Sequence, residues 1–87
     1  MRIKEGFVLR DVAGQAVVIA TGEASKRFHG MIKLNSTGRV IWEGLARGKS
    51  DEEIARSLVD EFDVTADQAA SDVAAFVDQV RENGFLA

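Results

Sequence analysis

Few residues of this chain have the type and spacing that catalysis or metal binding needs. His29 is the only histidine and the sequence has no cysteine, which excludes a multi-histidine metal site and thiolate chemistry. General acid–base or nucleophilic catalysis by His29 would need a partner group beside it, and the sequence offers none. We interpret His29 as a solvated loop residue and expect no catalytic residue, no metal and no cofactor.

The carboxylates form two groups that do not match a calcium-binding loop. The first group, at 51–53, directly follows Ser50 and is explained by helix capping. The second group, at 60–63, is interpreted as solvated surface at the end of a helix. The glycines form no dinucleotide or P-loop pattern. The sequence therefore favours a protein that is not an enzyme and whose function comes from the surface that its fold presents.

The elements that must position such a surface are strands first and helices after. β-branched-rich runs at Phe7–Val12 and Gln15–Ala20, separated by the turn signal Ala13-Gly14, predict a hairpin. A polar connector at 21–29 follows. Residues 30–34 are predicted as a short third strand, which makes the sheet an antiparallel meander.

The helix starts are predicted from capping residues. Asn35 begins the first helix, expected at 36–47 and ended by Gly48 in the left-handed conformation. Ser50 and Glu53 form a capping box that begins the second helix.

A second capping box, from Thr65 to Gln68, predicts the third helix, which runs to about Asn83 and stops at Gly84. Helical periodicity predicts which residues face the core. They are Val40, Ile41, Trp42 and Leu45; Ile54, Leu58 and Phe62; Ala69, Val73, Phe76, Val77 and Val80; and Phe85 and Leu86, which are expected to fold back onto it.

The composition of the chain indicates one small globular domain, residues 1–87. The formal charge is −3 with a pI near 5.0, which is unfavourable for binding phosphates. No apolar run is long enough to span a membrane and the start does not read as a signal peptide. We expect a cytoplasmic protein with no nucleic-acid and no membrane partner.

The order of short motifs along the chain resembles that of a known family. The motifs are Phe7-Val8-Leu9-Arg10, Leu34-Asn35-x-x-Gly38-x-x-Ile41-Trp42, Ser50-x-Glu52-Glu53-Ile54, Phe62-x-Val64, Asp72-Val73-x-x-Phe76 and Gly84-Phe85-Leu86. Together they resemble the PqqD-like family, named for pyrroloquinoline quinone synthesis protein D and also called the precursor-peptide recognition elements of ribosomally made, modified peptides (RiPPs).

The resemblance implies an α+β fold, a winged helix-turn-helix with a three-stranded antiparallel N-terminal sheet followed by three α-helices. It implies a stand-alone, non-enzymatic adaptor that binds the leader segment of a precursor peptide. The adaptor would present this leader to a tailoring enzyme such as a radical-SAM enzyme, or to a leader peptidase as in lasso-peptide pathways. The leader would add as a strand beside the third strand, in a groove against the third helix.

The third strand of a meander is a sheet edge with unpaired backbone groups, which suits strand addition. Which of its two faces lines the groove is left open by the sequence. Lys26 and Arg27 are a candidate electrostatic docking patch. The peptide-binding residues expected are Gly30, Met31, Ile32, Lys33 and Leu34 of the strand, with Ala69, Asp72, Val73, Phe76 and Val80 of the helix.

Two other functions compete with this expectation. The chain could be a small structural subunit of a biosynthetic enzyme with no ligand of its own. A DNA-binding winged helix is disfavoured, because the third helix carries four acidic residues against Arg81 alone. The acids are Asp67, Asp72, Asp78 and Glu82.

Overall fold

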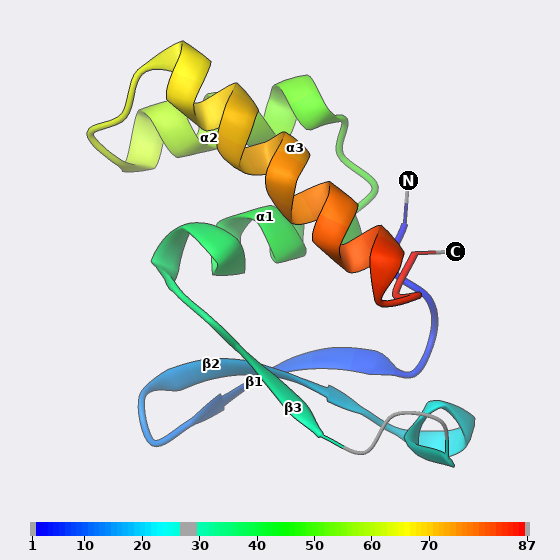
Figure 1. The fold of residues 1–87 in the computed structure, drawn as a ribbon. Coiled ribbons are helices and arrows are strands. Elements are labelled where there is room, and N and C mark those ends of the chain that lie inside the picture. Colours follow the sequence, from blue (N-terminus) through cyan, green and yellow to red (C-terminus); the bar gives the residue numbers. More distant parts are fainter. Residues whose placement is uncertain (1, 27–29, 87) are drawn as a thin grey trace.

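A three-stranded antiparallel sheet forms one layer of the protein, and the three helices lie on one side of it, with α2 further from the sheet than α1 (Figure 1). The computed structural model describes residues 2–26 and 30–86. The elements are β1 (Phe7–Val12), β2 (Gln15–Ala20), η1 (Gly22–Lys26), β3 (Met31–Leu34), α1 (Ser36–Ala46), α2 (Asp51–Glu61) and α3 (Ala66–Glu82). The predicted α+β fold, strands before helices, is confirmed.

The sheet has the order β1-β2-β3, so β1 and β3 are its two edges. The β1–β2 hairpin turns at Ala13 and Gly14, which have φ angles of 52° and 81°. Two successive residues with positive φ are typical of the type I′ turn, whose twist matches that of the flanking strands. The third strand is one residue shorter than predicted, because Gly30 lies in a bend before β3.

The predicted helix starts are confirmed by their caps. The Asn35 side chain accepts a hydrogen bond from the Gly38 N–H at 2.8 Å. At the start of α2, Ser50 and Glu53 bond reciprocally, at 3.0 and 3.2 Å, as a complete capping box. These bonds satisfy first-turn amides that have no partner within the helix.

Only one of the two hydrogen bonds of the second capping box forms. Thr65 Oγ1 accepts from the Gln68 N–H at 3.0 Å, as predicted. The Gln68 side-chain amide, however, donates to Asp72 Oδ1 at 2.7 Å, one turn further along α3, instead of reaching back to the cap. Gly48 and Gly84, with φ of 74° and 77°, follow α1 and α3 as the predicted left-handed stops.

Two groups of buried side chains form the core. The helix core lies between the three helices and consists of Ile41, Leu45, Ile54, Leu58, Ala69, Val73 and Val77. The sheet core lies between the sheet and the helices and consists of Ala16, Val18, Leu34, Trp42, Val80 and Phe85. Phe76 and Leu86 are partly buried and pack against both. The predicted core positions of Trp42 and Phe85 are therefore confirmed.

The C-terminal residues fold back onto the sheet layer, as expected. The Lys4 N–H donates to the Phe85 carbonyl at 2.7 Å, and Ile3 forms a bridge with Leu86. The two ends of the chain therefore lie on the same side of the molecule (Figure 1).

The connector between β2 and β3 contains the short 3-10 helix η1, which the sequence did not predict. His29 and Arg27 lie outside the described residues. Within 2–26 and 30–86, no helix has the length and apolar character needed to cross a membrane.

Candidate functional site

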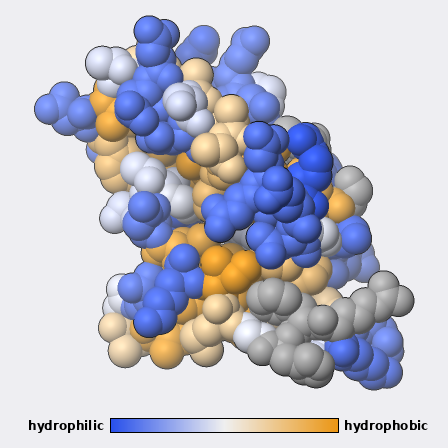
Figure 2. Space-filling view, in the orientation of Figure 1, coloured by the Kyte–Doolittle hydropathy of each residue, from blue (hydrophilic) through white to orange (hydrophobic). Residues whose placement is uncertain are grey.

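A hollow of about 320 Å³ lies between β3 and the C-terminal half of α3. In the space-filling view, hydrophobic side chains gather between α3 and the sheet, with hydrophilic surface on either side (Figure 2). We call this hollow the groove. It is lined by Val18, Ile32, Lys33, Leu34, Asn35, Gly38, Trp42, Phe76, Gln79, Val80, Asn83 and Phe85.

The inner face of β3 forms one wall of the groove. Ile32 pairs with Val18 and Leu34 pairs with Ala16, and all four belong to or pack against the sheet core. Side chains alternate along a strand, so Met31 projects from the opposite face, where it is 55% exposed. The structure thus assigns Ile32 and Leu34 to the groove, the choice that the sequence left open.

The outer edge of β3 carries no neighbouring strand among the described residues. Edge strands present backbone N–H and C=O groups that another strand can pair with. An extended segment placed there would lie beside the apolar groove and would extend the sheet.

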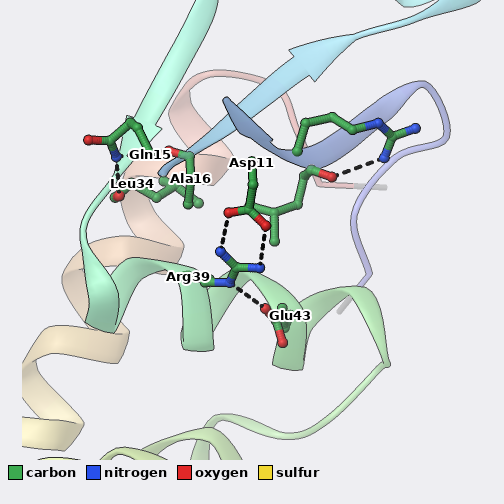
Figure 3. A network of polar contacts seen from close by, with 8 residues as sticks. Asp11, Gln15, Ala16, Leu34, Arg39 and Glu43 are labelled. Carbon is green, nitrogen blue, oxygen red and sulfur yellow. Dashed lines mark hydrogen bonds and ion pairs between the residues drawn. The ribbon is translucent and has the colours of Figure 1, made fainter. Parts of the chain in front are cut away.

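The edge at β1 is different, because polar side chains tie it to α1 (Figure 3). The Arg39 guanidinium bonds both carboxylate oxygens of Asp11 and also binds Glu43 at 3.0 Å. This guanidinium holds the pKa of Asp11 below its usual value. A shallow hollow beside β1 combines the apolar residues Phe7, Val8, Leu9, Trp42 and Ala46 with the charged residues Arg10, Glu43 and Arg47. The groove at β3 differs in having a single ionisable lining residue, Lys33.

The helical wall of the groove comes from one face of α3. Phe76, Gln79, Val80 and Asn83 line it, at helical spacing i, i+3, i+4 and i+7. The predicted Phe76 and Val80 are therefore in the groove. Gln79 and Asn83 were not predicted, although the same periodicity continued from Phe76 towards the C-terminus would have found them.

Three of the predicted peptide-binding residues on α3 lie outside the groove. Ala69 and Val73 are buried in the helix core, at 0% and 2% exposure, and do not line the groove. Asp72 is half-buried and accepts from Gln68, outside the lining of the groove. They lie outside the groove because the N-terminal half of α3 packs on α2 and only its C-terminal half covers the sheet.

Two predicted strand residues also lie outside the groove. Gly30 precedes β3 and Met31 faces away from the helices, and neither lines the groove. Lys33, on the outer face, contributes to the lining. We still predict that the backbone groups of residues 30–34 pair with the added strand.

Gly38 allows the groove to close tightly at one end. A Cβ atom at this position would lie 3.0 Å from Asn35 Oδ1 and 3.3 Å from Phe76 Cε2. Both distances are tighter than ordinary van der Waals contact. The absence of a side chain therefore lets the Phe76 ring approach the capped first turn of α1.

Aromatic rings form the floor of the groove. Trp42 and Phe85 are 3% and 2% exposed, and their ring centroids are 6.2 Å apart in an edge-to-face arrangement. The ring centroids of Phe7 and Phe85 are 4.5 Å apart. The sequence indicated Trp42 and Phe85 as core but contained no signal that they meet beneath one groove.

The groove has a mostly apolar lining. It is lined by apolar and amide side chains with Lys33 as the one ionisable group among the lining residues. Across the described part of the chain, no group of three His, Cys, Asp or Glu residues is placed to hold a metal ion. Lys26, one half of the predicted docking patch, is exposed and pairs with Glu23 at 3.3 Å.

Comparison with known proteins gives a family match and two similar folds. The family model for coenzyme PQQ synthesis protein D (PqqD) matches residues 8–86. The solved structure of TbiB1 in complex with the TbiA(beta) leader peptide has a TM-score of 0.78 and 22% identity, over 99% of this chain and 94% of that chain. Lasso peptide synthetase B1 complexed with the leader peptide has a TM-score of 0.78 and 24% identity, over 99% and 95%. Curated protein sequences give no match.

Proposed function

Because this chain belongs to the PqqD family, we propose that it is a non-enzymatic adaptor that binds the leader segment of a ribosomally made precursor peptide. The leader adds as a strand to β3 and places alternate side chains in the groove. The adaptor then presents the bound precursor to an enzyme that modifies or cleaves it. A cytoplasmic location is part of this proposal.

One observation carries the proposal: the open edge of β3 lies directly beside an apolar groove. Strand addition needs both parts, because main-chain hydrogen bonds supply affinity while pockets for alternate side chains supply specificity. The half-buried Ile32 and Phe76 stand on opposite walls of the groove, where an inserted apolar side chain would contact both.

The expected affinity follows from these contacts. About four main-chain hydrogen bonds at roughly 0.5–1.5 kcal/mol each, with one or two buried side chains at about 1.5–3 kcal/mol each, give a gross gain near 8 kcal/mol. Ordering a flexible leader opposes this gain. A dissociation constant of micromolar order or somewhat tighter is expected.

The two structural neighbours support the peptide-binding part of the proposal, since both are described as complexes with leader peptides. The partner enzyme is proposed by class only. A radical-SAM tailoring enzyme or a leader peptidase would accept a precursor held in this way.

The experiment measures binding of a fluorescein-labelled synthetic leader, taken from the precursor encoded beside this protein, by fluorescence anisotropy. Phe76→Asp places a charge in the apolar groove and should abolish binding. Val59→Asp, on the exposed surface of α2, is the matched control and should bind as the unmodified protein does. Far-UV circular dichroism checks that both variants keep their helices.

A second arm tests strand pairing itself. Ile32→Pro should abolish binding, because proline cannot donate to a strand ladder. Leader peptides N-methylated at single backbone positions test the same pairing without changing the protein. If the unmodified leader does not bind at high-micromolar protein, the proposal is overturned. If the protein then still captures an enzyme encoded beside it in a pull-down, the alternative of a structural subunit is favoured.

A further inference from the structure

A second hollow continues the groove beyond the end of α3. It has a volume of about 760 Å³ and shares Asn83 and Phe85 with the groove. We call it the exit hollow. Its other lining residues come from the N-terminal segment, from the start of β1, from η1 and from the residue after the α3 cap. They are Lys4, Glu5, Phe7, Glu23, Ala24, Lys26 and Gly84.

The positions of Phe76 and Asn83 relative to β3 show at which end of β3 the exit hollow lies. The Phe76 ring lies beside Gly38, near the C-terminal end of β3. Asn83, the residue that caps the C-terminal end of α3, belongs to both hollows. The exit hollow therefore lies at the N-terminal end of β3, on the side of Met31.

The direction of the added strand relative to β3 decides which end of the peptide lies in the exit hollow. All pairs in this sheet are antiparallel, and antiparallel pairing is slightly more stable per residue than parallel pairing. A peptide that continues the antiparallel order starts beside Leu34 and leaves beside Met31. Its C-terminal flank is the part that reaches the exit hollow.

The lining of the exit hollow differs in chemistry from that of the groove. The groove is mostly apolar, whereas the exit hollow has Lys4, Glu5, Glu23 and Lys26 around Phe7 and Phe85. Glu23 and Lys26 pair with each other. Among residues 2–26 and 30–86, Lys4 and Glu5 form no ion pair.

We propose, resting on the proposed function, that the exit hollow binds the polar C-terminal flank of the peptide whose preceding residues occupy β3. The adaptor thus recognises two consecutive segments of different chemistry. The first segment places every second side chain, which is apolar, in the groove. The second segment is polar and extended. The flank leaves the protein beside η1 and the C-terminal end of α3, which sets where the rest of the precursor emerges.

The test uses the absence of cysteine from the natural chain. Glu23→Cys places a single thiol at the rim of the exit hollow, and Arg56→Cys places one on the exposed surface of α2 as the matched control. The probe is the synthetic leader of the adjacent precursor, with one cysteine moved along its length. Disulfide formation requires Cα atoms within about 7 Å, so a cross-link reports proximity.

Peptide cysteines C-terminal to the strand-forming segment are expected to cross-link to Glu23→Cys and not to Arg56→Cys. N-methylation of single peptide residues identifies the strand-forming segment independently. Removal of the flank should weaken binding by about two- to five-fold, as expected for the loss of an exposed ion pair.

Cross-links from the N-terminal side alone would overturn the inference, because the bound strand would then be parallel to β3. Undiminished binding after flank removal, with no cross-link to Glu23→Cys, would also overturn it while leaving the adaptor function intact. If no leader binds at all, the proposed function fails and the inference fails with it.

Discussion

Phe76 is the side chain at which folding and the proposed binding meet. It is half-buried, packs against both core groups and lines the groove. Its ring approaches α1 only because position 38 is a glycine. A substitution at Phe76 therefore acts on stability as well as on binding, which is why helical content must be measured beside the affinity.

Asp11 and Arg39 predict a specific dependence of stability on pH. Hydrogen bonds from Arg39 lower the pKa of Asp11 from its usual value of 3.8, so the folded state favours the carboxylate more than the unfolded state does. This contribution is fully present above about pH 4 and is lost as the pH falls through the lowered pKa. Glu53, whose pKa is lowered by the Ser50 backbone N–H, adds a loss of the same sign.

We expect Asp11→Asn to unfold at lower urea concentration than the natural protein at pH 6 and to lose less stability between pH 6 and pH 3. Arg39→Gln should also lose less stability between pH 6 and pH 3. The stability of the double variant should differ little from that of either single variant. Circular dichroism at each pH measures these midpoints. Full acid sensitivity in Asp11→Asn would show that the ion pair contributes nothing in solution.

Two packing surfaces divide α3 along its length. The helix has 17 residues and, at roughly 1.5 Å per residue, is about 26 Å long. Its first part supplies Ala69 and Val73 to the helix core, and its last part supplies Val80 to the sheet core. The groove therefore lies against the C-terminal half alone, while the N-terminal half anchors the helix to α2.

The contact between α1 and α2 depends on Gly44. A Cβ atom there would lie 2.6 Å from Ile54 Cγ1, closer than real atoms approach, so the two helices would have to move apart. We expect Gly44→Ala to destabilise the protein by about 1–3 kcal/mol despite its better helix propensity.

Gly30→Ala is the matched control for this substitution. A Cβ atom at position 30 meets nothing within 4 Å, so the change should leave stability within about 0.5 kcal/mol. Urea denaturation followed by circular dichroism compares the two variants. Equal midpoints for Gly44→Ala and the natural protein would contradict the close contact between α1 and α2.

At the scale of the whole molecule, the two sheet edges have different surroundings. Polar contacts from Arg39 tie β1 to α1, while β3 adjoins the apolar groove. Charged side chains and side chains that tie an edge to a helix disfavour pairing with another chain. This asymmetry favours a single position for an added strand.

Hydrogen exchange should locate that position. When the synthetic leader binds, backbone amides of β3 and of the segment 76–83 should exchange more slowly, because new strand pairing and burial protect them. Amides of α2 should exchange at their unbound rates. Protection of β1 instead of β3 would place the peptide at the other edge and contradict the proposed orientation.

Local chemistry made most of the secondary structure predictable. Caps and turns act over about four residues, so Asn35, Ser50, Thr65 and the glycines that follow helices could be recognised from the chain. Gly30 and Gln68 were misplaced because a bend and a side-chain partner one turn away compete with the local pattern.

The groove could be predicted only in outline. Alternation along 30–34 defined two faces, and periodicity selected Phe76 and Val80, both within one element. Which strand face turns inward depends on where the helices lie. The floor joins Val18, Trp42 and Phe85, residues far apart in sequence. The sequence alone therefore determined the three strands, the three α-helices and most of their ends, because short-range hydrogen bonds and backbone preferences specify them. Only the tertiary structure decided which half of α3 forms the groove, because that choice comes from packing of the whole helix against α2 and the sheet.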